Sequence, residues 1–130
     1  MKFLQPPNWP RPKGYANGVA ARGNLVFLSG IVGWNAQGQF AGSDFVTQVR
    51  QALLNIVEIL NQAQAKPEHI ARMTWYVLDK NEYMSAAKEM GVAYREIIGR
   101  HYPAMTVVEV SGLVEARARV EIEVTAVVPD

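Results

Sequence analysis

The sequence predicts an α+β protein in which two helices cover one face of a mixed β-sheet. Residues 120–128 alternate between apolar and polar side chains, as a half-buried strand does. Residues 45–60 carry an apolar stripe at helical spacing. Residues 70–78 are rich in β-branched and aromatic side chains, which favour a strand. The length of 130 residues fits one domain spanning residues 1–130.

The first half of the chain predicts an arm, two strands and a helix. Residues 5–14 contain four prolines and a glycine, which predicts an extended arm. Residues 18–22 and 25–32 predict two strands, with Arg22-Gly23-Asn24 as the turn between them. A loop over residues 33–42 follows. Ser43 or Asp44 is suited to cap the next helix, which should end before Pro67.

The second half predicts a strand, a second helix and two more strands. The strand covers residues 70–78, and the helix runs from about residue 83 to 98 with Gly99 as its stop. Residues 104–110 and 120–128 predict the remaining strands. Two helices cover only one face of such a sheet. We therefore expect a partner subunit to cover the other face.

Composition excludes several classes of function. The net charge is +1, which gives no field that favours nucleic acid or an anionic membrane. There is no cysteine, so disulfides and thiolate chemistry are excluded. The N-terminus lacks the apolar run of a signal peptide, and no stretch is long enough to span a membrane. We expect a soluble cytoplasmic protein.

Few residues suggest chemistry by themselves. His69 and His101 have no carboxylate at metal-ligand spacing beside them, so we expect no metal site. Ser29 is outside any Gly-x-Ser-x-Gly motif, which disfavours a nucleophile. Glu121 and Glu123 share the polar face of the last strand. They form either a solvated face or a site in which a carboxylate positions water or accepts a proton.

Several segments of the chain are distinctive when they are taken together. They are Gly14-Tyr15-Ala16-Asn17-Gly18, Val26-Phe27-Leu28-Ser29-Gly30, Met73-Thr74-Trp75-Tyr76-Val77-Leu78-Asp79, Tyr102-Pro103-Ala104 and Val120-Glu121-Ile122-Glu123. The most specific is the C-terminal block, which combines a Tyr-Pro strand start with an aliphatic-Glu-Ile-Glu strand. With these segments the chain resembles the YjgF/RidA family over nearly its whole length.

The resemblance implies a chorismate-mutase-like fold with a mixed six-stranded sheet, assembled as a homotrimer with clefts between subunits. It also implies hydrolysis of small reactive enamines and imines to a ketone and ammonia, without a metal or organic cofactor. Carried over residue by residue, the resemblance makes Glu121 the catalytic carboxylate. It places Tyr15, Ser29, Gly30 and Met105 at the substrate.

The sequence departs from the family pattern at residue 105. Family deaminases carry an arginine there that binds the substrate carboxylate, and this chain carries Met105, which cannot. The glutamine that usually follows Ser-Gly is replaced by Ile31, which suggests a more apolar pocket. If deaminase activity is retained, another basic residue must bind the substrate carboxylate. The candidates are Arg22, Arg72, Arg117 and Arg119.

Two functions therefore stay open. The first is a hydrolytic deaminase with altered specificity, for which the 2-aminomuconate deaminases of the family are a precedent by analogy. The second is a non-catalytic trimer that binds a small apolar or amphipathic metabolite. A ribonuclease function, a label that some relatives carry, is disfavoured by the near-neutral charge and the lack of a histidine-based acid/base pair.

Overall fold

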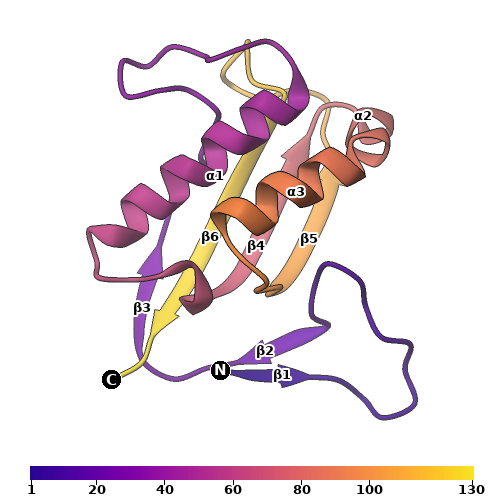
Figure 1. The fold of residues 1–130 in the computed structure, drawn as a ribbon, viewed down its shortest axis with the longest axis vertical. Helices are drawn as coiled ribbons and strands as arrows, with labels where there is room; N and C mark the ends of the chain where they lie inside the picture. Colours follow the sequence, from indigo (N-terminus) through magenta and orange to yellow (C-terminus); the bar gives the residue numbers. More distant parts are fainter.

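The fold is α+β, with three helices and two β-sheets, in a computed structural model that describes residues 1–130 (Figure 1). A 3₁₀ turn at Pro67–His69 leads directly into the strand Ile70–Val77. In chain order the helices and strands are β1 Lys2–Leu4, β2 Gly18–Ala20, β3 Asn24–Phe27, α1 Phe45–Asn61, β4 Ile70–Val77, α2 Lys80–Ser85, α3 Ala87–Ile97, β5 Ala104–Glu109 and β6 Val120–Val128.

The expectation of one six-stranded sheet is wrong. Four strands form a mixed sheet in the order β3-β6-β4-β5, in which only the β4–β5 pair is parallel. The other two, β1 and β2, form a separate antiparallel ribbon, drawn at the bottom of Figure 1. The sheet is therefore mixed, as predicted, but it is smaller.

The predicted hairpin between residues 18–22 and 25–32 is also wrong. β2 pairs with β1, a short strand that the sequence did not indicate, while β3 pairs with β6. Gly23 lies between β2 and β3 in the chain and has a φ of 150°. Its Cα lies against the backbone of Val128. A Cβ at Gly23 would lie 2.7 Å from the Val128 carbonyl carbon. This close approach brings Asn24 into register with Val128 instead of with β2.

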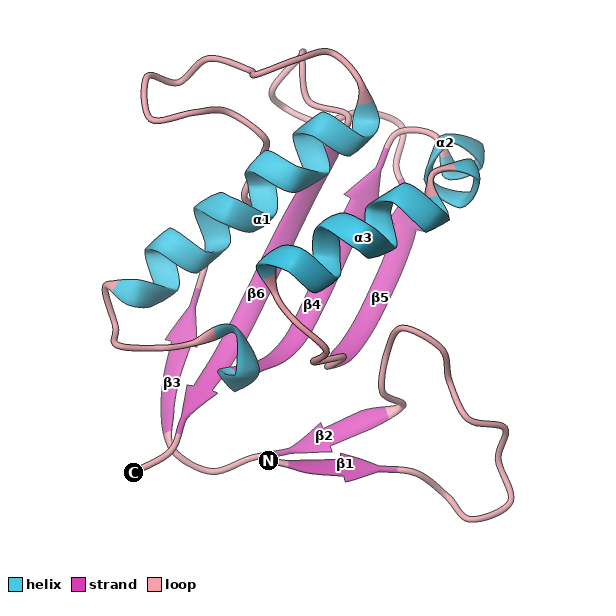
Figure 2. Cartoon of the chain, viewed as in Figure 1, coloured by secondary structure: helices cyan, strands magenta, loops and turns pink.

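The two long helices lie on one face of the four-stranded sheet, as predicted (Figure 2). Asp44 caps α1, because its carboxylate accepts a hydrogen bond of 3.1 Å from the Thr47 backbone N–H. The buried stripe of α1 matches the predicted periodicity. Its buried residues are Phe45, Gln48, Val49, Ala52, Leu53, Ile56 and Leu60.

The second predicted helix begins earlier than expected and is divided. Asp79 caps α2, accepting hydrogen bonds from the backbone N–H groups of Asn81 (2.9 Å) and Glu82 (3.2 Å). Ala86, with φ of −90° and ψ of 4°, separates α2 from α3. The chain therefore turns once between the two helices, so α2 lies at the end of the sheet while α3 packs beside α1.

The alternation of β6 sorts its side chains onto two faces. Val120, Ile122 and Val124 are fully buried beneath the helices, whereas Glu121 and Glu123 point to the opposite face. No helix covers that opposite face (Figure 2), and Phe27 of β3 is 71% exposed. None of the helices is long and apolar enough to cross a membrane.

Candidate functional site

The residues singled out in the sequence divide between the two faces of the four-stranded sheet. Met105 of β5 lies in register with Met73 of β4, whose side chain is buried beneath the helices. Glu121 of β6 lies in register with Tyr76 of β4, on the uncovered face. Because neighbouring strands place registered residues on the same face, Met105 and Glu121 face opposite sides of one sheet.

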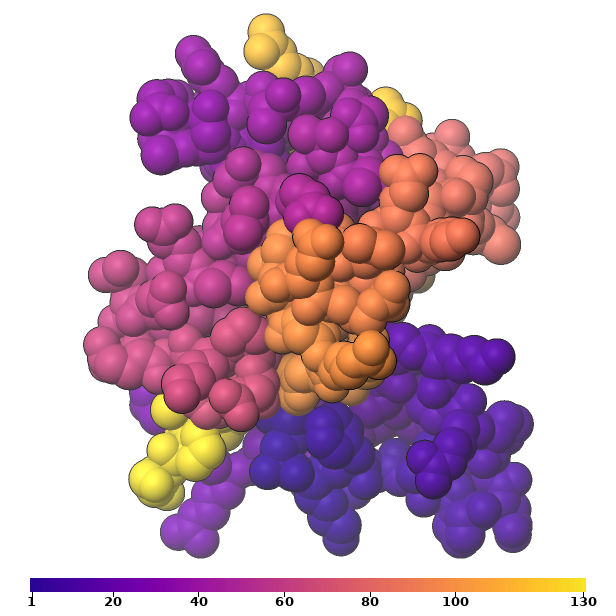
Figure 3. Space-filling view, viewed as in Figure 1, coloured from indigo at the N-terminus to yellow at the C-terminus, as the bar shows by residue number.

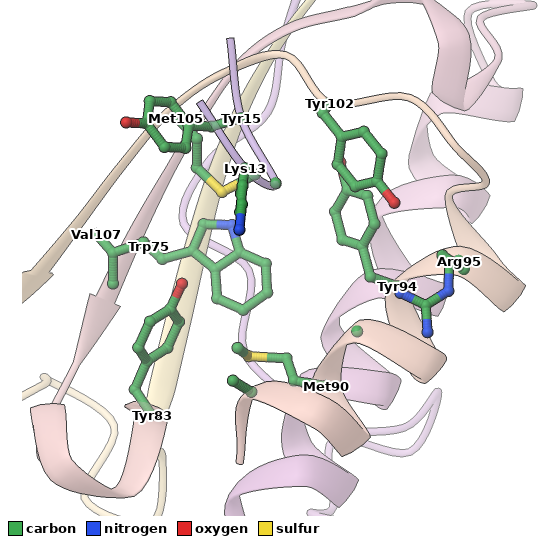
Figure 4. A pocket seen from close by; sticks show the side chains of 13 residues that line it. Lys13, Tyr15, Trp75, Tyr83, Met90, Tyr94, Arg95, Tyr102, Met105 and Val107 are labelled. Carbon is green, nitrogen blue, oxygen red and sulfur yellow. The ribbon is translucent and has the colours of Figure 1, made fainter. Parts of the chain in front are cut away.

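Met105 and Tyr15 lie in the wall of a cavity of about 680 Å³ between the helices and the sheet (Figure 4). Helices α2 and α3 form one wall, strands β4 and β5 form the second, and the N-terminal segment forms the third. The lining residues are Lys13, Gly14, Tyr15, Trp75, Tyr83, Ala87, Met90, Gly91, Tyr94, Arg95, Tyr102, Met105 and Val107.

A backbone contact brings the N-terminal segment to this cavity. The Ala16 N–H donates a hydrogen bond of 2.9 Å to the Pro103 carbonyl, and Ala16 forms a parallel bridge with Ala104. Tyr15 and Met105, which are far apart in sequence, therefore line one cavity. In Figure 3 the N-terminal residues (indigo) lie directly below α3 (orange) on this side of the molecule.

Aromatic rings dominate the cavity wall. Trp75 and Tyr83 meet edge to face with centroids 6.2 Å apart, and Tyr94 stacks on Tyr102 at 5.5 Å. The Tyr94 hydroxyl donates a hydrogen bond of 2.7 Å to the His101 carbonyl. Burial raises the pKa of Tyr83 and of Tyr94, so both phenols are neutral at physiological pH.

The positive charges at the cavity are Lys13 and Arg95, neither of which was expected from the sequence. None of the four arginines suggested as replacements for the missing arginine lines this cavity. Arg119 instead pairs with Glu82 at 2.9 Å, and Arg22 lies 3.9 Å from Asp130. Which basic side chains reach the cavity depends on tertiary contacts, and these cannot be read from the composition.

On the uncovered face, Glu121 lies against Gly30. A methyl group at Gly30 would lie 2.9 Å from the Glu121 Cγ and closer still to its carboxylate. Two backbone hydrogen bonds between Ile31 and Ile122, of 2.8 and 2.9 Å, fix this approach. Ser29 is exposed just before Gly30. The structure thus brings Gly30 and Glu121 together, with Ser29 next to Gly30 in the chain, and separates them from Tyr15 and Met105.

Ile31, suggested to make the pocket more apolar, lies elsewhere. It belongs to the main hydrophobic core and does not line the cavity. Two of the three tryptophans, Trp9 and Trp34, do not line the cavity either, and Trp34 lies beside Phe40 with ring centroids 6.1 Å apart. The third tryptophan, Trp75, lies in both the core and the cavity wall.

The helical part of the cavity wall was missed by sequence reasoning. Tyr83, Met90 and Tyr94 were read only as part of a helix. Their spacing of seven and then four residues places them on one side of the helical segment, which was the available signal. The structure contains no group of three or more His, Asp or Glu side chains placed to hold a metal ion.

Comparison with known proteins agrees with this fold. The family model described as Endoribonuclease L-PSP matches residues 9–128. A RutC family protein of Aquifex aeolicus is 33% identical over 130 residues, covering 98% of this chain and 99% of that protein. The 2-iminobutanoate/2-iminopropanoate deaminase of Escherichia coli is 30% identical over 130 residues, covering 97% of each chain. A Rid-family protein of unknown function from Yersinia pestis superposes with a TM-score of 0.83 at 26% identity over 98% of each chain.

The mixed sheet and its two covering helices define a small α+β protein with the fold of the Rid-family structure. The chain belongs to the YjgF/RidA/RutC family, the family described by the Endoribonuclease L-PSP model.

Proposed function

We propose that this protein is a hydrolytic deaminase of a small reactive enamine or imine, which releases ammonia. The observation that carries the proposal is the Glu121 carboxylate held against Gly30 on an exposed sheet face. Relatives at 30% and 32% identity, from Escherichia coli and Capra hircus, are 2-iminobutanoate/2-iminopropanoate deaminases. Their named activity supports the reaction class for this chain.

The active form in this proposal is a homotrimer with the site between subunits. Met105 and Glu121 face opposite sides of one sheet, so a site that uses both needs two copies of the chain. The uncovered face carries exposed apolar side chains, including Leu25 and Phe27, which a second copy would bury. Glu121, Ser29 and Gly30 would come from one subunit, and Tyr15 and Met105 from its neighbour.

The reaction needs little from the protein beyond orientation and proton transfer. The imine carbon is already electrophilic, and a water oxygen attacks it as the C–N double bond opens. The Glu121 carboxylate accepts the proton that the water loses, and the nitrogen gains a proton. In the carbinolamine that results, a second proton moves from the new hydroxyl to the nitrogen. The C–N bond then breaks, ammonia leaves, and the hydroxyl oxygen becomes the ketone oxygen. An enamine enters this sequence after protonation of its β-carbon.

Met105 sets the specificity in this proposal. Its thioether cannot pair with the substrate carboxylate as an arginine does. Loss of a buried, hydrogen-bonded charge contact costs about 2–5 kcal/mol of binding unless another group replaces it. The protein should therefore act poorly on 2-aminoacrylate and better on a different imine, of which a 2-aminomuconate-type compound is one candidate.

The second candidate function is that of a non-catalytic trimer which binds a small metabolite. Met105 and the aromatic cavity wall favour it, because both suit an apolar ligand. Glu121 would then belong to a structural or solvated face.

Ammonia release separates the two candidate functions. The purified protein is added to reactions that generate 2-aminoacrylate, 2-aminomuconate and other enamines or imines, and the rate is compared with the uncatalysed rate. Acceleration that disappears in Glu121→Gln supports the deaminase. No acceleration on any imine, in a correctly folded trimer, supports the binding protein.

A further inference from the structure

The cavity beside Met105 is larger than a three-carbon substrate requires. Its volume of about 680 Å³ equals the space of roughly twenty water molecules at about 30 Å³ each. The anion 2-iminopropanoate has only six non-hydrogen atoms. The volume falls within the range of small-molecule pockets, about 300–1,000 Å³. A substrate that fills the cavity must therefore carry a large side chain.

The indole N–H of Trp75 has no hydrogen-bond partner. The side chain is 2% exposed, and Nε1 is the one buried side-chain polar atom without a partner. Figure 4 shows this nitrogen on the edge of the ring toward Met105, within the cavity wall. Buried polar groups are nearly always hydrogen-bonded, so an unpaired donor here indicates an acceptor supplied by a ligand.

The charges around the cavity indicate the sign of that ligand. Lys13 and Arg95 line the cavity, and neither forms a salt bridge. No aspartate or glutamate lines it, and the buried phenols of Tyr83 and Tyr94 are neutral. An anion in the cavity therefore meets two cations without a salt-bridge partner and no acidic side chain of the same chain.

We propose that this cavity binds the carboxylate of an aryl-substituted 2-imino or 2-oxo acid, with its aromatic ring held among the lining aromatic side chains. The Trp75 Nε1–H donates a hydrogen bond to an acid oxygen beside Met105. Lys13 supplies the positive charge that the missing arginine would otherwise supply, and Arg95 adds to the positive potential. The proposal rests on the proposed function, because it names the substrate class of that site.

Binding without turnover tests the proposal. Isothermal titration calorimetry of the trimer compares 3-phenylpropanoate, butanoate and the neutral 3-phenylpropan-1-ol. Burial of the phenyl ring should make 3-phenylpropanoate bind at least about tenfold more tightly than butanoate. The alcohol should bind more weakly than the acid. Equal affinities of 3-phenylpropanoate and butanoate, or of the acid and the alcohol, would overturn the proposal.

Two substitutions test the named contacts. Trp75→Phe keeps an aromatic ring and removes the N–H, and it should weaken 3-phenylpropanoate binding by about threefold to tenfold. Trp34→Phe, outside the cavity, is the matched control. Lys13→Gln should also weaken binding, while Lys88→Gln on the outside of α3 should not. Unchanged affinity in both Trp75→Phe and Lys13→Gln overturns the assigned contacts.

The outcomes also separate this proposal from the deaminase proposal. If 3-phenylpropanoate binds but no imine releases ammonia, the deaminase proposal is excluded. The cavity is then supported as a binding site for an aryl-substituted acid. Rapid turnover of 2-iminopropanoate without measurable binding of 3-phenylpropanoate keeps the deaminase and overturns the aryl-acid site.

Discussion

The Cα of Gly30 lies so close to the side chain of Glu121 that a methyl group at residue 30 would stand 2.9 Å from the Glu121 Cγ. Gly30→Ala should therefore displace the carboxylate without preventing folding, because the end of a glutamate side chain is flexible. We expect ammonia release to fall by about 10²-fold, the usual cost of misplacing a reacting group by about 1 Å. A wild-type rate in a folded Gly30→Ala trimer would contradict the role of this contact.

Glu121→Gln tests the proton acceptor directly. The change keeps the size of the side chain and removes its basicity, so the rate should fall by about 10²–10⁴-fold with the trimer intact. Glu123→Gln is the matched control. Glu123 lies on the same face and accepts a hydrogen bond of 3.2 Å from Tyr76, and it does not contact Gly30. Equal rates in the two variants would mean that Glu121 only forms part of a structural or solvated face.

Met105→Arg restores the cation that family deaminases carry. We expect activity on 2-aminoacrylate to appear or to rise by about tenfold or more, because a guanidinium binds a carboxylate through two hydrogen bonds. Met105→Leu, which changes shape without adding charge, should give no gain. The interpretation of Met105 fails if the wild type already matches an arginine-bearing relative on this substrate.

The homotrimer is itself a testable prediction. Light scattering at micromolar concentration should give three times the 14.4 kDa mass of the chain. Phe27→Asp places a charge on the uncovered sheet face and should yield monomers, because an unpaired charge is costly to bury. Met84→Asp, at a similarly exposed apolar residue on α2, should remain trimeric. A monomeric wild type would exclude a site assembled between subunits.

The cap of α1 predicts a pH-dependent contribution to stability. The hydroxyl and backbone N–H of Thr47 hold the pKa of Asp44 below its ordinary value of 3.8. The stabilisation that the ionised Asp44 gives to the folded state is therefore fully present above pH 3.8. It is lost as the pH falls through the lower pKa that Asp44 has in the folded protein.

Denaturant unfolding at pH 7 and in acid measures this contribution. At pH 7, Asp44→Ala should lower the free energy of unfolding by about 1 kcal/mol. The difference from wild type should shrink in acid. Ser43→Ala, at the other residue suited to cap this helix, should have a smaller effect. If Asp44→Ala lowers the free energy of unfolding by the same amount at both pH values, the cap does not depend on the charge of Asp44.

The sequence alone determined the elements whose pattern is local. The alternation of β6 and the apolar stripe of α1 predicted both elements and their buried faces, because each follows from the period of its own backbone. The same alternation separates Glu121 from the buried side chains of its strand. The resemblance places Tyr15, Gly30, Met105 and Glu121 at one site. Within a single chain the structure separates Tyr15 and Met105 from Gly30 and Glu121.

Tertiary structure alone decided what depends on pairing between distant segments. β2 could pair with β3 or with β1, and the approach of Gly23 to Val128 selects the second arrangement. Lys13 and Arg95 line one cavity only because Ala16 bonds to Pro103 while α3 packs over the sheet. Local periodicity carries no information about such partners, since their choice depends on the free energy of the whole packed chain.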